Sequence, residues 1–305
     1  MKKQALLLAL LCCLKGAIAQ TDSATLEKDT TNSIQNDSII PPKKDTIRIG
    51  NIIIIKDNKE GHKSGLGLSL RKDNHAKKKS KITTNWWVVD LGISNYNDKT
   101  DYADVGDYLV NSPGAPDFNE HDFRLRSGKS INVNIWAFMQ RLAIGKGYFN
   151  LKYGLGIELN NYRFKSNISF KENGIIPYSG GIETNVPFVY RDSIQFSKNK
   201  LAADYLTVPV MFNFRTRPFN KKNNFSISLG VSAGYLYSQR NKQKSQERGK
   251  MKNKGDYDLK PFKLSYIGEL GMGPITLYGS FSPKSIFQNN MHFQPYNIGI
   301  RLGRL

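Results

Sequence analysis

From residue 86 onward, apolar side chains recur at every second position in segments of about ten residues. This alternation is typical of strands with one apolar and one polar face. In the third segment, FNLKYGLGIELN, leucine, tyrosine and isoleucine alternate with lysine, glycine, glutamate and asparagine, which a soluble core does not tolerate. The segments that show the pattern cover residues 86–96, 130–139, 149–164, 205–214, 225–237, 263–272, 275–281 and 294–302.

The connections between these segments alternate between short and long. Short turns lie near residues 145–147, 218–224 and 273–274, and long connections cover residues 97–128, 165–204, 238–262 and 282–293. Bacterial outer-membrane barrels show this alternation, with short turns in the periplasm and long loops outside. We therefore predict an all-β fold in residues 86–305: an eight-stranded, antiparallel, up-and-down transmembrane β-barrel with both termini periplasmic and long loops extracellular. A barrel of this size is filled by its own side chains.

The first residues read as a signal peptide covering residues 1–19. Lys2 and Lys3 precede an apolar run, and Ala17 and Ala19 form a small-x-small cleavage site before Gln20. The apolar run is too short to span about 30 Å of hydrocarbon. The only cysteines of the chain lie in this segment. The mature chain is therefore expected to have no disulfide and no thiolate metal site.

Residues 20–85 are mostly polar and lack helical periodicity, so we predict a mostly disordered periplasmic tether. A basic run, RKDNHAKKKSK, ends it. One island, DTIRIGNIIIIKD, predicts a short hairpin at residues 46–56 that turns at Gly50 and Asn51. Such a hairpin could bind a periplasmic protein partner by strand addition.

Charged residues on the polar faces of the segments are expected to lie in the lumen, where unpaired charges are costly. Asp90 and Arg301 fall on the first and last segments, each about four residues from the short-turn end, so they should be neighbours. We expect a network of acids and bases that plugs the lumen; the alternative is a set of unpaired charges in a wet lumen. The predicted members are Asp90, Lys152, Glu158, Glu269 and Arg301.

Aromatic residues near the segment ends suggest two girdles at the lipid interfaces, although ordinary strand propensity is an alternative. The principal candidates are Trp86, Trp87 and Phe149 on the short-turn side and Tyr162, Tyr235 and Tyr237 on the long-loop side. Further candidates are Phe214, Phe225, Tyr96, Phe164, Tyr205 and Tyr266.

The chain is strongly basic, with a formal net charge of +20. Removing the three lysines of the signal peptide from 45 basic residues leaves 42 against 25 acidic ones, or +17. Basic residues gather in the connection 238–262, where phosphates of lipopolysaccharide are the expected partner and simple solvation is the alternative. The candidate contacts are Arg240, Lys242, Lys244, Arg248, Lys250, Lys252 and Lys254. Export argues against nucleic acid as a partner.

The sequences DYLTVPVMFNF and FSISLGVSAGYLYS, which include Pro209 and Gly230, resemble the outer-membrane β-barrel family often labelled porin-like. That family includes the PorT-type proteins and shares the architecture of OmpA/OmpX-type barrels. The resemblance covers residues 86–305 and implies an outer-membrane location, an eight-stranded barrel and a need for barrel-assembly machinery during biogenesis. It transfers no catalytic residue, and its members serve diverse functions.

Candidate catalytic chemistry is sparse. His121 lies among carboxylates in PDFNEHDF, but no nucleophile-elbow, metalloprotease or phosphate-loop motif is present. We therefore expect a non-enzymatic protein without cofactor or metal that acts in envelope structure, surface binding or adhesion, or secretion and assembly. One alternative is an outer-membrane hydrolase or acyl-modifying enzyme that uses His121. Another is a soluble lipocalin-like carrier, whose barrel would be apolar inside and polar outside.

Overall fold

The computed structural model describes residues 45–49, 52–56, 81–217, 224–289 and 291–302. The chain divides into two units, residues 1–77 and 78–305. In the first unit, β1 (Asp45–Ile49) and β2 (Ile52–Lys56) pair antiparallel, with Ile49 opposite Ile52. The predicted signal peptide and most of the predicted tether lie outside the described residues.

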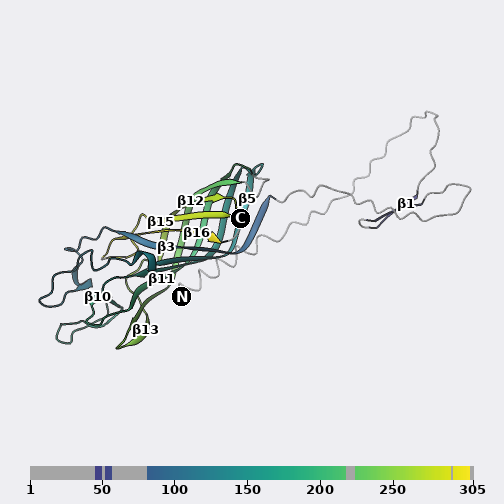
Figure 1. Ribbon diagram of the computed structural model, residues 1–305. Coiled ribbons are helices and arrows are strands. Elements are labelled where there is room, and N and C mark those ends of the chain that lie inside the picture. The colour runs from purple at the N-terminus through teal and green to yellow at the C-terminus, as the bar shows by residue number, and fades with distance from the viewer. Residues whose placement is uncertain (1–44, 50–51, 57–80, 218–223, 290, 303–305) are drawn as a thin grey trace, which may run out of the picture. The chain divides into compact units, whose positions relative to one another are not determined.

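In the second unit, eight antiparallel strands close into a ring, which confirms the predicted barrel topology (Figure 1). Neighbouring strands pair in the order β3, β5, β6, β11, β12, β14, β15, β16 and back to β3. Each of the eight predicted segments corresponds to one of these strands. Their bounds are β3 (Ile82–Asp98), β5 (Ile131–Gly145), β6 (Phe149–Arg163), β11 (Lys198–Arg215), β12 (Phe225–Ser245), β14 (Phe262–Met272), β15 (Ile275–Phe281) and β16 (Phe293–Leu302).

The two faces of the ring have opposite character. Along β6, every second side chain from Asn150 to Tyr162 is buried, and the residues between them are partly exposed. Most apolar side chains in the middle of the strands point away from the lumen, and the buried positions there are rich in asparagine, serine and charged residues. The exception is a small buried cluster of Val88, Trp136, Met139 and Met211. This distribution is the reverse of a lipocalin-like carrier and argues against that alternative. The outward apolar residues form what we call the apolar belt, which includes Leu91, Ile93, Leu206, Val208, Val210, Phe212, Leu229, Val231, Leu264, Leu270, Leu277, Ile298 and Ile300.

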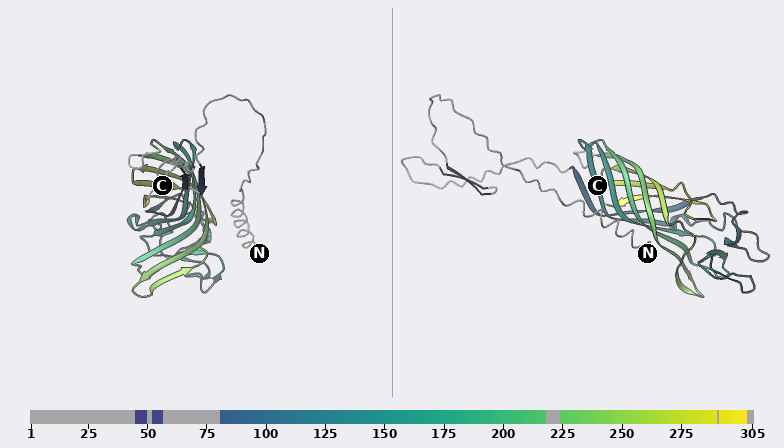
Figure 2. Two further views of the ribbon diagram at one scale, coloured as in Figure 1. Left: turned by 90° about the vertical axis from the view of Figure 1, so that its right-hand side faces the viewer. Right: turned by 180° about the vertical axis from the view of Figure 1, so that it is seen from behind.

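Two strands extend well beyond their predicted limits. β11 begins at Lys198, not near residue 205, and β12 continues to Ser245, where a turn leads into β13 (Gly249–Lys254). The predicted connection 238–262 is therefore largely a β-hairpin, which projects at one end of the ring (Figure 2). Its residues alternate between basic and neutral polar side chains, so hydrophobic periodicity does not reveal it.

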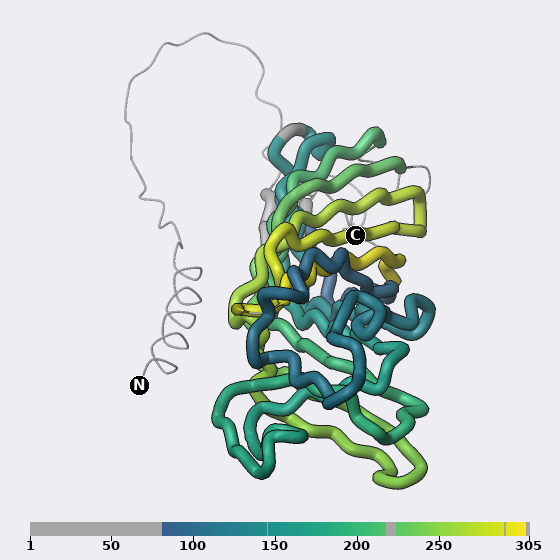
Figure 3. Tube along the Cα trace, turned by 90° about the vertical axis from the view of Figure 1, so that its left-hand side faces the viewer, coloured from purple at the N-terminus to yellow at the C-terminus, as the bar shows by residue number. Residues whose placement is uncertain are grey.

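The long connections fold over the same end of the ring (Figure 3). They carry short elements of their own. β10 (Phe188–Arg191) pairs with β4 (Leu109–Val110) and with β7 (Ile168–Lys171) to form a three-stranded sheet. β8 (Gly174–Ile175) pairs with β9 (Glu183–Thr184), and the 3-10 turns η1 (Gly106–Tyr108) and η2 (Ser127–Lys129) precede β4 and β5. None of the described residues forms a helix long and apolar enough to cross a membrane.

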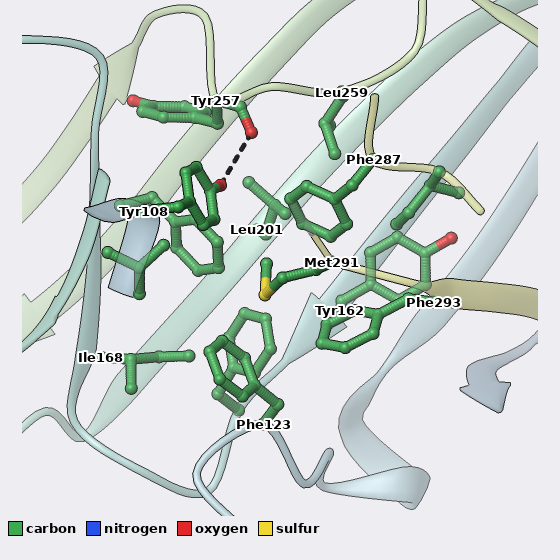
Figure 4. Packing of buried hydrophobic residues seen from close by; sticks show 14 of the residues in the cluster. Tyr108, Phe123, Tyr162, Ile168, Leu201, Tyr257, Leu259, Phe287, Met291 and Phe293 are labelled. Atoms are coloured by element: carbon green, nitrogen blue, oxygen red, sulfur yellow. Dashed lines mark hydrogen bonds between the residues drawn. The ribbon is translucent and has the colours of Figure 1, made fainter. Parts of the chain in front are cut away.

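A hydrophobic core fills the long-loop end of the ring (Figure 4). Phe293 of β16 stacks on Tyr96 at a ring-centroid distance of 4.3 Å and meets Phe123 and Phe287 of the connections at 5.5 and 5.4 Å. The hydroxyl of Tyr108 donates a hydrogen bond of 3.1 Å to the Tyr257 carbonyl oxygen. Burial raises the pKa of Tyr108, so this hydroxyl keeps its proton.

This core corrects part of the predicted long-loop girdle. Tyr162 is only 1% exposed, and Phe164 and Tyr205 are also buried, so none of the three can face lipid. Tyr162 stands an even number of residues from Lys152, which places both on the inward face of β6. Beyond the apolar belt, toward the long loops, the inward side chains of the strands pack against the folded connections instead of lining a polar lumen.

On the short-turn side, a local backbone irregularity in β3 turns two adjacent tryptophans outward. Trp86 pairs with Phe138 and Val88 pairs with Trp136, so the register between β3 and β5 is unchanged, and Trp87 between them has a positive φ of 55°. Trp86 and Trp87 are 67% and 74% exposed, and Phe149 is exposed as well. Simple alternation from Val88 would have turned Trp86 into the lumen. Of the long-loop candidates, Tyr237 is exposed and Tyr235 is partly exposed.

Gly230 of β12 leaves no room for a side chain against the neighbouring strand. A Cβ atom there would lie 2.1 Å from the Val210 carbonyl oxygen and 2.6 Å from the Met211 Cα of β11. We expect Gly230→Ala to lower the free energy of unfolding by about 1–3 kcal/mol, because backbone must move to admit the methyl group. The measurement is urea unfolding of the folded barrel in lipid vesicles. Gly268→Ala on β14 is the control, since its nearest neighbours lie at 3.5 and 3.9 Å; equal losses for both variants would contradict this prediction.

Candidate functional site

A buried charge network crosses the lumen near the short-turn end. Arg301 of β16 donates two hydrogen bonds to the Asp90 carboxylate of β3, of 2.6 and 2.9 Å, and also contacts Glu269 of β14. Lys152 of β6 pairs with the other oxygen of Glu269. The four side chains thus join β16, β3, β14 and β6 in one layer of two acids and two bases.

Neutral donors complete this layer. The Trp136 indole N–H donates to Asp90 at 2.7 Å, and the Ser228 hydroxyl donates to Glu269 at 3.2 Å. All four charged groups are almost fully buried. Buried charges are tolerated when paired and hydrogen-bonded, and removing one partner leaves an uncompensated charge.

The fifth predicted residue, Glu158, lies in a second polar layer toward the long loops. Its partner is Lys263 of β14, which the sequence reasoning did not select. Asn160 and Asn297 donate to Glu158 at 3.0 and 3.3 Å. Lys263 stands an even number of residues from Glu269 on β14, so both side chains face the lumen. This spacing could have identified Lys263 from the sequence.

Little space remains between these layers. A cavity of about 30 Å³ lies among Asp90, Trp136, Glu158 and their neighbours, room for about one water molecule. On the long-loop side of Glu158, the Lys263 ammonium lies 4.5 Å from the ring centroid of Tyr205, which belongs to the hydrophobic core of the long-loop end. From the short-turn end, the lumen therefore contains a charge layer, a second polar layer and an apolar cap.

A second charged feature lies on the outside of the ring, where β6, β11, β12 and β13 extend past the apolar belt. Arg163, Lys200, Lys242 and Lys252 occupy directly paired positions on the four strands. This row is roughly 14 Å wide at about 4.8 Å per strand. We call the whole surface the cationic face; it comprises Arg163, Lys198, Lys200, Arg240, Lys242, Lys244, Lys250, Lys252 and Lys254.

The reverse side of the same sheet is buried by a long connection. Asn199 and Gln243 donate to the Ile168 carbonyl oxygen, and Asn241 donates to that of Phe170. Because side chains alternate between the two sides of a strand, the basic side chains point to the outer side. On β11 this is the side that carries the apolar residues from Leu206 onward. The connection thus determines which way the cations point.

Like charges on paired strands destabilise a sheet, and little on this face offsets them. Arg240 pairs with Asp204, the Arg163 guanidinium donates to the Ser197 carbonyl oxygen at 2.7 Å, and the Lys200 ammonium donates to Asn161 at 2.6 Å. Burial, together with the charges of Lys242, Lys198 and neighbouring arginines, lowers the pKa of Lys200 to about 8.

One of the basic residues predicted from the sequence does not belong to this face. Arg248 lies in the turn between β12 and β13 and pairs with Asp192 at 2.9 Å. Conversely, Arg163, Lys198 and Lys200 were not predicted from the sequence, because they lie earlier in the chain than the basic connection. Only the pairing of β6 and β11 with β12 brings them to it.

The structure does not assemble a catalytic arrangement around His121. Its neighbours are engaged elsewhere: Asp122 pairs with Arg191, and Glu120 pairs with Arg124. The Asn119 side chain accepts a hydrogen bond from the backbone N–H of His121. Among the described residues, no hydrogen bond links the His121 ring to a carboxylate.

Residues 87–288 match the family described as outer membrane protein beta-barrel domain. The chain belongs to this family. As a member, it is an outer-membrane β-barrel protein, and its exposed apolar belt faces lipid. No curated protein matches the sequence.

Solved structures similar to this chain include the crystal structure of Ail, the attachment invasion locus protein of Yersinia pestis, at 11% sequence identity. A second is Ail in complex with the heparin analogue sucrose octasulfate, at 10% identity. Each comparison covers 72% of this chain and 98% of Ail, with a TM-score of 0.27.

Removing Arg301 tests the charge layer. In Arg301→Met, Asp90 and Glu269 share one remaining cation, Lys152, so we expect the free energy of unfolding to fall by about 3–5 kcal/mol. Urea titration in vesicles, followed by tryptophan fluorescence, measures it. Lys250→Met, on the exposed part of β13, should change stability little. A loss below 1 kcal/mol for Arg301→Met would contradict the prediction.

The filled lumen should not conduct ions. We expect the wild-type protein in planar bilayers to show no stepwise current at moderate voltage, because the polar layers and the apolar cap leave no continuous aqueous path. Bilayers with a known porin, recorded under the same conditions, provide the positive control. Regular unitary conductance steps from the wild-type protein would contradict it.

Proposed function

We propose that this chain is a non-enzymatic outer-membrane barrel that binds lipopolysaccharide phosphates through its cationic face, and so acts in envelope structure and surface binding. The observation that carries the proposal is the row formed by Arg163, Lys200, Lys242 and Lys252 across four paired strands. In this arrangement the long loops are extracellular and both barrel termini are periplasmic, as the alternation of connections predicts.

The position of the face supports this partner. On β11 the outward side chains pass from Phe212 through Val208 and Leu206 to Lys200 and Lys198. Apolar residues thus meet acyl chains, and cations follow at the height of the head groups. Each basic residue near an anionic leaflet gains about 1 kcal/mol at physiological salt.

A phosphate partner also explains why so many like charges are retained side by side. Bridging anions would relieve the repulsion that, together with the larger effect of burial, lowers the pKa of Lys200. The resemblance to PorT-type proteins rests on strand sequences and supplies no residue for secretion, so we propose binding in preference to transport. Roles for barrel-assembly machinery, and for a periplasmic partner of the β1–β2 hairpin, remain predictions.

A triple substitution tests the proposal. We expect Lys200→Gln, Lys242→Gln and Lys252→Gln, combined in one variant, to weaken lipopolysaccharide binding at least tenfold at about 0.15 M salt and to reduce its salt dependence. The measurement is titration of the protein, in non-ionic detergent, with lipopolysaccharide micelles.

The matched control removes the same charge from exposed lysines of the long connections outside the cationic face. Lys99→Gln, Lys129→Gln and Lys284→Gln should together leave affinity within about twofold of wild type. Equal weakening by both triple variants would show that only net charge matters and would overturn the proposal.

The binding should also depend on pH. Because the pKa of Lys200 is lowered to about 8, this ammonium loses its proton between pH 7 and pH 9 in the free protein. An anion favours the protonated form, so affinity for lipopolysaccharide should fall as the pH rises through this window. Lys200→Gln should reduce the decline; an unchanged pH profile in that variant would contradict the assignment.

A further inference from the structure

A polar cavity of about 290 Å³ occupies the short-turn end of the lumen. Its inner wall is the charge layer, represented by Lys152 and Glu269, and its sides are the last inward residues of several strands. The cavity is separate from the cationic face, which lies on the outer surface at the opposite end of β11. Its lining includes Thr83, Arg141, Arg215, Asn224, Ser226 and Thr276.

Two guanidinium groups line this cavity without an acidic partner among the described residues. Arg215, the last residue of β11, is only 7% exposed, and its backbone N–H donates a hydrogen bond to the Tyr148 carbonyl oxygen. Arg141 of β5 makes a long contact of 3.4 Å to the Thr83 hydroxyl. No ion pair joins either arginine to a carboxylate within the part of the chain that the structure describes.

The charge balance of the lumen leaves these two arginines in excess. The buried acids Asp90, Glu158 and Glu269 are already paired with Arg301, Lys263 and Lys152. Arg141 and Arg215 therefore add two positive charges that no described lumen carboxylate offsets. A buried charge without a partner is costly, which favours an anion in the cavity.

The remaining wall suits a tetrahedral oxyanion. Guanidinium groups bind phosphate oxygens through paired N–H donors, and the hydroxyls of Ser226 and Thr276 can supply further donors. Gly271 keeps the cavity open on the β14 side: a Cβ atom there would lie 2.4 Å from the Ser226 hydroxyl oxygen. The volume is at the lower end for small-molecule pockets, so the ligand must be small.

We propose that this cavity is a binding site for the phosphate group of a small molecule that enters from the short-turn side of the barrel. Arg215 and Arg141 hold the phosphate oxygens, and Lys152 contributes positive potential from the inner wall. The site is independent of lipopolysaccharide binding at the cationic face, because the two share no residue.

Calorimetric titration of the full-length protein in a non-ionic, phosphate-free detergent tests the proposal at constant ionic strength. Inorganic phosphate and glycerol 3-phosphate are the probes, and acetate is the comparison carboxylate. We expect saturable binding of one phosphate per barrel, with both phosphates binding more tightly than acetate. Tighter binding of glycerol 3-phosphate than of inorganic phosphate would indicate a phosphomonoester ligand, and the reverse would indicate free phosphate; either order supports the site.

Substitutions locate the binding. Arg215→Gln and Arg141→Gln should each weaken phosphate binding at least tenfold, and Arg215→Lys should retain part of the affinity. Lys242→Gln combined with Lys252→Gln, on the cationic face, should leave it unchanged. Heat-modifiable gel migration verifies folding, and if Arg215→Gln does not fold, the more exposed Arg141 provides the deciding variant.

Three results would overturn the proposal. One is the absence of saturable phosphate binding by the wild-type protein at constant ionic strength. Another is unchanged affinity in the folded Arg141→Gln variant. The last is loss of binding only in the Lys242→Gln and Lys252→Gln variant, which would move the phosphate to the outer surface.

Discussion

Backbone pairing in hydrocarbon is the constraint on which the rest of this structure depends. A strand in lipid has no water to satisfy its N–H and C=O groups, so β-strands can cross only as a closed ring. Closure through the β3–β16 and β11–β12 pairings removes both free edges. It also forces every second side chain toward lipid and every other one into a narrow lumen. The two chemical faces of the strands follow from this geometry.

The narrow lumen then makes charge pairing necessary. An eight-stranded ring holds side chains and little water, so each inward charge needs a partner within the lumen. Arg301 meets Asp90 on an adjacent strand, whereas Lys152 and Glu269 come from strands that are not neighbours in the ring. Such contacts connect opposite walls and complement the hydrogen bonds between adjacent strands. In the short-turn cavity, cations outnumber acids among the described lining residues.

The long-loop end shows how the same alternation acquires a new role outside the apolar belt. On the inner side, positions such as Tyr162 and Leu201 bury against the folded connections and build a core of the kind found in soluble proteins. On the outer side, outward positions are leucine or valine within the apolar belt and lysine or arginine beyond it. A single strand such as β11 therefore takes part in lipid contact, a buried core and a charged surface. One connection, residues 164–197, covers the inner side and keeps the cations facing outward.

The sequence by itself determined the number, order and facing of the eight barrel strands, because alternation with period two is a local property of each segment. It also indicated the meeting of Asp90 with Arg301, since depth can be counted along adjacent strands. Tertiary structure decided what local patterns could not: the positive φ at Trp87, where Trp86 turns outward, and the burial of Tyr162 beneath folded connections. It likewise decided the assembly of Arg163 and Lys200 with Lys242, because these residues are distant in the chain and only cross-strand register makes them neighbours.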